Sequence, residues 1–357
     1  MLNDDLRLDD DFNLEGDSHS NDDLNRSVSS VKTVSTALNM VDRLGAIRAR
    51  LGVGRAAYAV EPGLYAVGAP DGDAPVLVSA NYKLTFDTLR KNLGGLDCWL
   101  LILDTDGVNV WCAAGKGTFG TDELVSRIEV AELTKYVSHR ELILPQLGAA
   151  GVSAHIVKKR SGFDVRYGPV RAGDIRAYIG AGCKASKEMR AVGFTLRDRL
   201  VLTPMELIPA LKYSIPVFGF MLLSKKFVPK PFDMTDAALN AGAILSGTVL
   251  APALLPYIPG RAFALKGWIA GLACAAGILG LSKKYKKGNR LAAAGSLLLY
   301  PAVSSFLAMN FTGSSTYASP SGVNKEMKRA LPFVVGSAAA GLALTLGVRF
   351  FGGRGEK

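Results

Sequence analysis

The sequence has few cysteines and histidines, and they are not grouped. Its four cysteines, Cys98, Cys112, Cys183 and Cys274, are widely spaced and include no Cys-x-x-Cys pair. This spacing argues against a disulfide framework and against a zinc or iron–sulfur cluster site. A reducing, cytoplasmic setting fits such cysteines best.

The N-terminal region lacks the apolar segment of an export signal. Residues 1–23 are rich in Asp, together with Ser and Asn. Such a stretch has too little apolar surface to bury, so we expect a solvated, disordered acidic tail over residues 1–40.

A complete phosphate-binding loop is also missing. The sequence Gly-Lys-Gly-Thr at residues 115–118 resembles the end of such a loop. However, the motif needs a glycine five residues before Gly115, and Val110 occupies that position. Nucleotide hydrolysis is therefore disfavoured.

The basic residues do not form the pattern of a nucleic-acid site, although the net charge is +11. Many of them lie beside apolar segments, as Lys225, Lys226, Lys283 and Lys284 do, and not among aromatic residues. We expect no nucleic-acid partner, because anionic membrane lipid is the better counterpart for charges in these places.

Long apolar segments recur only in the second half of the chain. Four of them approach the ~20 residues that a helix needs to cross a bilayer. These four predicted spans are residues 237–258, 262–282, 291–309 and 330–348. A fifth span is predicted over residues 207–223, in a helix that starts at the Thr-Pro-Met-Glu sequence of residues 203–206. We therefore expect a membrane domain over residues 204–357.

The placement of charge leaves the number of crossings open at four or five. If the first half of the chain is cytoplasmic and residues 207–223 cross, the basic loop at residues 283–290 falls outside, against the positive-inside rule. If that helix is re-entrant or lies at the interface, the same loop falls inside.

The first half of the chain, residues 41–203, alternates short apolar runs with helical patterns. The run at residues 98–103 is apolar almost throughout, which is typical of a central strand in a parallel sheet. Further strands are predicted at residues 75–80, 141–144 and 163–167, with helices between them at residues 121–137 and 152–159. This order predicts an α/β fold, a Rossmann-like doubly wound domain, followed by an all-α transmembrane domain. Ligands of such sheets bind at the carboxyl ends of the strands.

One loop at this edge carries a cysteine in unusual surroundings. Residues 109–116 read Asn-Val-Trp-Cys-Ala-Ala-Gly-Lys and follow the apolar strand and its Asp-Thr-Asp-Gly end. A lone cysteine beside a tryptophan is more often a packed core residue. Here the small flanking residues would let a large flat ligand approach, and a thiolate suits a soft metal that a macrocycle already holds. Cys112 is therefore a candidate axial ligand of a cofactor metal.

Several segments together resemble a known family, the corrinoid proteins of anaerobic mercury methylation (the HgcA family). The resemblance covers about residues 58–203, and the distant relatives lack the cysteine. More distantly, the chain resembles the corrinoid domain of the large subunit of the corrinoid iron–sulfur protein of acetyl-CoA synthesis. The segments that carry the resemblance are residues 80–87, 98–106, 109–121, 139–143 and 167–170.

The resemblance implies a base-off corrinoid whose cobalt takes the Cys112 thiolate as its lower ligand, supplied by a short cap helix. The residues implied to shape the cap are Asn109, Val110, Trp111, Ala113, Ala114, Gly115 and Lys116. Those implied to line the corrinoid are Thr85, Pro145, Gly148, Gly168 and Pro169. The three histidines stand outside the Asp-x-His-x-x-Gly context of His-ligated corrinoid proteins, which is consistent with a sulfur ligand.

The activity implied is that of a corrinoid-dependent methyltransferase of an anaerobe. A methyl group would pass from the cobalt to Hg(II), giving methylmercury, because an anionic sulfur opposite the methyl group favours its release with carbanion character. The implied partner is a ferredoxin-like protein with two [4Fe–4S] clusters, HgcB, as reductant. The implied location is the cytoplasmic membrane, with the corrinoid domain in the cytoplasm.

Two alternatives stay open. The chain could be a membrane-anchored methyl carrier of a one-carbon pathway of the acetyl-CoA type. It could also be a membrane transporter with a corrinoid-binding cytoplasmic domain. Ionisable groups buried in the spans would favour transport.

Overall fold

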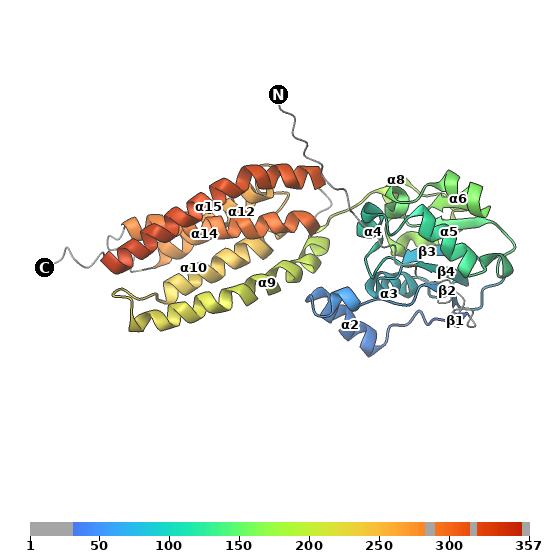
Figure 1. Ribbon diagram of the computed structural model, residues 1–357, viewed down its shortest axis with the longest axis horizontal. Helices are drawn as coiled ribbons and strands as arrows, with labels where there is room; N and C mark the ends of the chain where they lie inside the picture. Colours follow the sequence, from blue (N-terminus) through green and yellow to red (C-terminus); the bar gives the residue numbers. More distant parts are fainter. Residues whose placement is uncertain (1–30, 283–289, 315–319, 352–357) are drawn as a thin grey trace, which may run out of the picture. The chain divides into compact units, whose positions relative to one another are not determined.

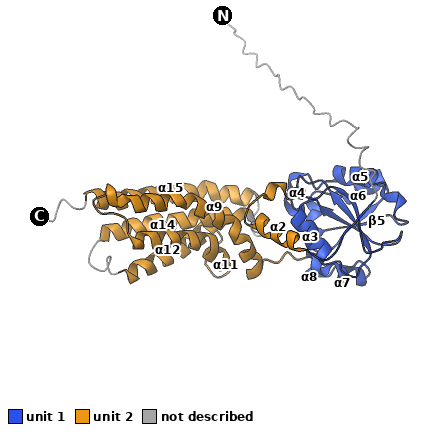
Figure 2. Ribbon diagram, turned by 90° about the horizontal axis from the view of Figure 1, so that it is seen from below, with its two compact units in different colours: residues 1–38, 59–190 blue, residues 39–58, 191–357 orange. Residues whose placement is uncertain are grey.

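The computed structural model describes residues 31–282, 290–314 and 320–351, and these residues form two compact units. Figure 2 colours the two units separately. The first, which we call the α/β unit, contains residues 31–38 and 59–190 of the described chain. The second, the helical unit, contains residues 39–58 and the described residues from 191 onward. The predicted boundary after residue 203 therefore differs from the division of the structure, which falls after Arg190.

The α/β unit is built on one six-stranded sheet with the order β1-β2-β4-β3-β5-β6. Strands β3 to β6 run parallel to one another, β2 is antiparallel to β4, and β1 is parallel to β2. The strands are β1 (Lys32–Thr33), β2 (Gly63–Val67), β3 (Val76–Ala80), β4 (Cys98–Leu103), β5 (Glu141–Leu144) and β6 (Asp164–Tyr167).

Helices cover both faces of this sheet (Figure 1). Side chains of α4, α5 and α6 form one apolar core with the strands, and side chains of α3 and α7 form a second core on the other face. The helices are α3 (Lys83–Lys91), α4 (Val110–Lys116), α5 (Thr121–Val130), α6 (Ala154–Ser161), α7 (Ile175–Gly180) and α8 (Lys187–Arg190). Short 3-10 helices are η3 (Leu133–Lys135), η4 (Gln146–Ala150) and η5 (Ala172–Asp174). The predicted α/β fold with a parallel sheet is confirmed.

The connections after β3 and β4 leave the sheet on opposite faces. These two strands are neighbours, with Val76 beside Trp99 and Ala80 beside Leu103. The chain leaves β3 into α3 on one face and leaves β4 into α4 and α5 on the other. In doubly wound sheets a crevice opens at such a switch point, beyond the carboxyl ends of the two strands.

The structure differs from the prediction of a disordered tail where residues 31–40 are concerned. Strand β1 pairs with β2, and the guanidinium of Arg90 donates to the carbonyl oxygens of Ser35 and Ala37. These contacts join the segment to the sheet, and helix α2 begins at Met40. Residues 1–30 lie outside the described residues.

A helix predicted to reach residue 137 is shorter in the structure. Helix α5 ends at Val130, and Glu132 adopts a left-handed backbone with φ 46° before η3 begins. A non-glycine residue in this conformation interrupts a helix, and periodicity alone does not reveal it.

The helical unit contains four helices that are long and apolar enough to cross a membrane. Among the described residues these are Leu196–Lys226, Phe263–Leu281, Arg290–Gly313 and Ser321–Phe351. The elements of the unit are α2 (Met40–Arg50), η2 (Arg55–Ala57), α9 (Leu196–Leu223), η6 (Ser224–Lys226), α10 (Met234–Leu245), the π-helical η7 (Ser246–Leu250), α11 (Ala251–Ala253), α12 (Phe263–Leu281), α14 (Arg290–Asn310), η8 (Phe311–Ser314) and α15 (Pro320–Phe351).

Two of the predicted spans differ from these helices. Helix α9 starts at Leu196, not near residue 203, because Thr195 and Asp198 form a capping box. It continues through Pro204, Pro209 and Pro216 and has the length of a span. The predicted span 237–258, by contrast, contains α10, η7 and α11, and the chain leaves the helix after Ala253. The basic loop at residues 283–289 lies outside the described residues, so its side of the membrane stays a prediction.

Small residues allow the helices of this unit to approach closely. A Cβ added to Gly271 of α12 would lie 2.5 Å from Cβ of Ser304 on α14, and one added to Gly341 of α15 would lie 2.7 Å from the carbonyl oxygen of Gly295 on α14. The Ser304 hydroxyl also donates to the carbonyl oxygen of Gly267, at 2.8 Å. Such contacts are typical of helices packed in a lipid environment.

Candidate functional site

Asn81 connects the two strand ends at the switch point. It follows β3 and is 5% exposed. Its Nδ2 donates to Asp104, at 3.0 Å, and its Oδ1 accepts from the backbone amides of Thr105 and Gly107, at 3.1 and 3.0 Å. The Thr105 hydroxyl lies 2.8 Å from the same oxygen. One buried amide side chain thus fixes the turn that follows β4.

This turn leads directly into α4, the helix that carries Cys112. Asp106 adopts a left-handed backbone with φ 54°, and the Asp104 carboxylate accepts from its amide. Asn109 is the N-cap, and its side chain accepts from the amide of Cys112, at 2.9 Å. The position of Cys112 in the first turn of the helix is therefore set by Asn109 locally and by Asn81 through the turn.

Helix α4 buries small residues and exposes its cysteine. Val110, Ala113 and Ala114 face the core of the α/β unit. The opposite side presents Trp111, Cys112, Gly115 and Lys116, all of them exposed, and we call this the Cys112 face. Trp111 is 41% exposed, so it is not part of the apolar core. A Cβ added to Gly115 would meet no atom within 4 Å, which leaves the face open.

The other residues implied to bind a cofactor reach the same edge from neighbouring strands. Thr85 lies in the first turn of α3, directly after β3, and is half-buried. Pro145 follows β5 and leads into η4, which contacts α4. Gly168 and Pro169 follow β6 and are buried. The fold therefore gathers these segments at one edge of the sheet.

Gly148 and Gly168, two of the residues that the resemblance implies to line the corrinoid, lie in close contact with protein side chains. A Cβ added to Gly148 would lie 2.5 Å from the ring of Phe119, and one added to Gly168 would lie 3.0 Å from Ile143. Their small size is explained without a ligand. A role for Gly148 or Gly168 in lining a cofactor stays a prediction.

Cys98, another cysteine of the α/β unit, has a different environment from Cys112. Cys98 is fully buried at the start of β4, and burial raises the pKa of its thiol to about 12. The Cys98 thiol therefore stays protonated at neutral pH. No group of three or more His, Cys, Asp or Glu side chains that could hold a metal ion occurs in the described part of the chain. A metal at this site would need ligands from outside the protein as well as Cys112.

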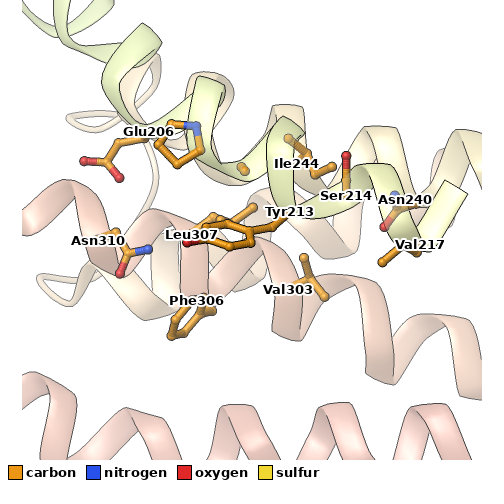
Figure 3. Close-up of a pocket in the computed structure, with 12 residues that line it drawn as sticks. Glu206, Tyr213, Ser214, Val217, Asn240, Ile244, Val303, Phe306, Leu307 and Asn310 are labelled. Atoms are coloured by element: carbon orange, nitrogen blue, oxygen red, sulfur yellow. The ribbon is translucent and has the colours of Figure 1, made fainter. Parts of the chain in front are cut away.

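The helical unit contains a cavity of about 530 Å³ between α9, α10 and α14. Figure 3 shows Glu206 and Asn310 at one end of it, and Ser214 and Asn240 at the other. Asn240 Nδ2 is buried and has no hydrogen-bond partner among the described residues. None of the described lining residues is a cysteine, methionine or histidine, so the cavity does not fit a soft metal ion.

Comparison with known proteins locates similarity in the α/β unit. Residues 53–179 match the family described as CO dehydrogenase/acetyl-CoA synthase delta subunit. The acetyl-CoA decarbonylase/synthase complex subunit gamma of Archaeoglobus fulgidus is 34% identical over 122 residues, which are 34% of this chain and 26% of that protein. The corresponding subunit of Methanocaldococcus jannaschii is 39% identical over 98 residues, 27% of this chain and 20% of that protein.

The chain spans about a quarter of the length of the curated relatives it matches, 26% in the first case. The similarity supports the more distant of the two resemblances, to proteins of acetyl-CoA synthesis. It covers Cys112 and all of its neighbours at the sheet edge. The nearer resemblance, to mercury methylation, stays a prediction.

Sequence reasoning did not single out Asn81 or Thr105. Both lie in segments that carried the family resemblance, but nothing in the sequence shows that β3 and β4 are neighbours. The sequence offered one indication of Asn81, namely that it is a polar residue directly after an apolar strand.

Proposed function

We propose that the α/β unit binds a corrinoid and uses it to transfer a methyl group. The observation that carries this proposal is the exposed Cys112 face at the switch point of a doubly wound sheet. Support comes from the similarity of the unit to subunits of acetyl-CoA decarbonylase/synthase complexes.

The residues at the site fit such a cofactor. A flat macrocycle needs an open face, and the exposed side of α4 has a glycine and a thiol with no protein atoms above Gly115. The Thr118 hydroxyl, two residues beyond α4, is buried and has no hydrogen-bond partner in the described part of the chain. This hydroxyl is therefore available to form a hydrogen bond with a ligand. The donor set is a single thiol, which suits a metal whose other positions a macrocycle fills.

Each side chain then has a definite task. Cys112 would hold the metal of the corrinoid through its thiolate, and Asn109 and Asn81 fix the position of Cys112 through the helix cap and the turn. Trp111 excludes water beside the ligand, and Thr85 approaches from the opposite face of the sheet. A bound corrinoid would supply the methyl group, and a thiolate ligand from Cys112 would favour release of that methyl group with its electron pair.

We propose Hg(II) as the methyl acceptor and methylmercury as the product. The argument is the Asn-Val-Trp-Cys-Ala-Ala-Gly-Lys segment, which resembles the corrinoid proteins of mercury methylation. A mercuric ion is soft and electron-poor, and accepts a methyl group with its electron pair. Return of the cofactor to its methyl-accepting state needs electrons, for which we propose the ferredoxin-like HgcB, because no cluster site occurs among the described residues.

The four apolar helices would anchor the methyltransferase in the cytoplasmic membrane, with the α/β unit on the cytoplasmic side. A transport role is the alternative, and buried charges in the helical unit bear on it. Asp236 and Arg349 form a buried ion pair, and Lys266 donates to the carbonyl oxygen of Leu255 at 2.6 Å. These charges make structural contacts, and Glu206 is the one charged residue among the described residues that line the cavity. Anchoring is therefore favoured over transport.

The test begins with the cofactor. The full chain, purified without oxygen from cells supplied with a corrinoid, is expected to hold about one cobalt per chain, with a base-off absorption spectrum and a cobalt–sulfur signal in X-ray absorption. Cys112→Ala is expected to lose the cobalt–sulfur signal, whereas Cys183→Ala, at a half-buried position of the same unit, is expected to keep it. An unchanged signal in Cys112→Ala would rule out the ligand assignment.

The acceptor is tested separately. Cells that carry this chain and the ferredoxin-like partner should convert isotopically labelled Hg(II) to methylmercury, and deletion of the chain should stop the conversion. Cobalt binding without methylmercury formation would favour the methyl-carrier alternative of a one-carbon pathway. Absence of both would leave the transporter alternative.

A further inference from the structure

Helix α2 exposes a continuous apolar stripe. Met40, Leu44, Ile47 and Leu51 follow one another at intervals of three or four residues, so they lie on one side of the helix. Their exposed fractions are 67%, 52%, 53% and 37%. An apolar stripe of this kind normally faces a core, and here no described residue of the helical unit covers it.

Arginines border this α2 stripe on both sides. With 3.6 residues per turn, Arg43 and Arg50 lie along one border and Arg48 along the other. Arg43 and Arg48 are exposed, and neither pairs with a carboxylate among the described residues. Long basic side chains in this position can extend their charge to the polar side of an interface while their stems stay on apolar surface.

The opposite side of α2 packs against protein. Asp42 and Ala49 are 7% and 1% exposed. Asp42 forms a capping box with Asn39, and the Tyr58 hydroxyl donates to its carbonyl oxygen, at 3.4 Å. Tyr58 also packs against Gly45, where a larger residue would clash. The orientation of the helix is therefore fixed, with the stripe directed outward.

Helix α2 belongs to the helical unit, although the sequence places it before the sheet. It packs against α9, and Arg55 of the following η2 lies in hydrogen-bond contact with the sulfur of Met205 on α9. The contact lies in the N-terminal part of α9, where Arg197, Asp198 and Arg199 precede the apolar stretch. Charged residues at the end of an apolar helix mark the level of the membrane surface.

We propose that α2 lies on the membrane surface and inserts its apolar stripe among anionic phospholipids. The inference rests on the membrane placement of the helical unit. An apolar face, arginines on both borders and attachment near the charged end of α9 are the features of an interfacial helix. Because the bordering arginines are positively charged, we expect the lipid to be anionic.

The test uses the full chain in lipid nanodiscs, with a tryptophan placed on the stripe. Leu44→Trp and, as a second variant, Ile47→Trp are compared in lipids with and without bromine atoms in the upper acyl chains. Brominated lipid is expected to remove most of the emission that each substitution adds. Lys159→Trp on α6, an exposed position of the α/β unit, is the solvent control and should keep its added emission.

The native Trp268 of α12 allows the membrane placement of the helical unit to be tested separately from the position of α2. Of the three native tryptophans, Trp99 and Trp111 belong to the α/β unit and Trp268 to the helical unit. Loss of the Trp268 share of the parent emission, measured against a Trp268→Phe variant, shows whether the helical unit lies in the bilayer. If the parent is quenched and the added emission of both stripe variants is not, the inference is overturned, whether water, the α/β unit or a second copy covers the stripe.

The lipid class is tested with headgroups. Quenching of Leu44→Trp at low salt should be stronger in phosphatidylglycerol than in phosphatidylcholine nanodiscs. The further change of Arg43, Arg48 and Arg50 to Gln should abolish this difference. Equal quenching in the two lipids would overturn the assignment to anionic phospholipid.

Discussion

The α/β unit and the helical unit differ in where they place many of their large apolar side chains. In the α/β unit large apolar side chains such as Leu101, Phe119 and Phe163 are fully buried. In the helical unit Leu281 and Phe333 are 85% and 77% exposed, while Ser304 is fully buried between helices. Water drives apolar groups inward in the first case. In the second, the proposed lipid surroundings would leave no such drive, and close approach of helices would become the main source of stability.

This difference indicates how each unit should respond to mutation. Removing volume should damage the α/β unit, because its core depends on filled apolar space. Adding volume should damage the helical unit, because its helices are in contact through glycine and serine. The four predictions that follow test or refine this contrast.

The largest effect is expected from Phe119→Ala in the α/β unit. Phe119 is fully buried and packs against Gly148, next to the end of α4. The change should lower the unfolding free energy of the unit by about 3–5 kcal/mol. Hydrogen exchange of the β4 amides measures it, because these amides exchange when the unit unfolds. Ile156→Ala, at a position 38% exposed, is the control and should change the value by about 0.5 kcal/mol or less.

In the helical unit Gly271→Leu is expected to be the damaging change. The new side chain would meet Ser304 and the backbone of Pro301, so α12 and α14 must separate at a cost of about 1–3 kcal/mol. Thermal unfolding in nanodiscs should show a lower midpoint. Gly277→Leu adds the same side chain to the same helix at a place where a Cβ meets nothing, and it should leave the midpoint unchanged. Equal effects of the two changes would contradict the packing account.

A polar contact is the subject of the third prediction. Asn81→Ala removes the oxygen that accepts from the amides of Thr105 and Gly107, at a cost of about 1–3 kcal/mol for buried groups left unsatisfied. Exchange of these two amides should accelerate, and binding of cobalt should weaken because Cys112 is less well positioned. Asn92→Ala, which loses one bond to Thr88 on the surface of α3, should affect neither measurement.

The smallest effect is expected from a comparison of two cysteines of the α/β unit. Exposed Cys112 should react with iodoacetamide in the native chain at neutral pH, and Cys98 should not. Because burial raises the pKa of Cys98 from 9.0 to about 12, the folded state favours the protonated thiol. Its contribution to stability is complete below pH 9 and is lost as the pH rises toward 12. Cys98→Ala should flatten this part of the stability profile, and labelling of native Cys98 at neutral pH would contradict the account.

Much of the fold could be predicted because its signals are local. The apolar run at residues 98–103 and its neighbours gave the strands β3 to β6 at nearly their observed bounds. Spans were harder to assign. The helix that contains residues 207–223 was predicted to start at residue 203, whereas α9 begins at Leu196 and continues through three prolines. Residues 237–258 are equally apolar, and the prediction missed the break after Ala253.

The candidate site was predictable in part. Cys112 stands in a segment whose small residues and family resemblance mark it, and the structure shows that it is exposed. Its role as a metal ligand stays a prediction. The roles of Gly148 and Gly168 could not be judged from the sequence, because a glycine that contacts Phe119 looks the same as a glycine that admits a ligand. Asn81 was missed because its partners lie more than twenty residues away, in the turn that follows β4.

The sequence by itself determined where strands, helices and apolar segments lie, and which loop carries the distinctive cysteine. Only the tertiary structure decided that β3 lies beside β4, so that Asn81 can hold the turn before Cys112. It also decided that α2 packs with the helical unit and directs its apolar stripe outward. The physical reason is that hydrophobic periodicity is set by neighbouring residues, whereas strand pairing and helix packing depend on contacts between distant parts of the chain.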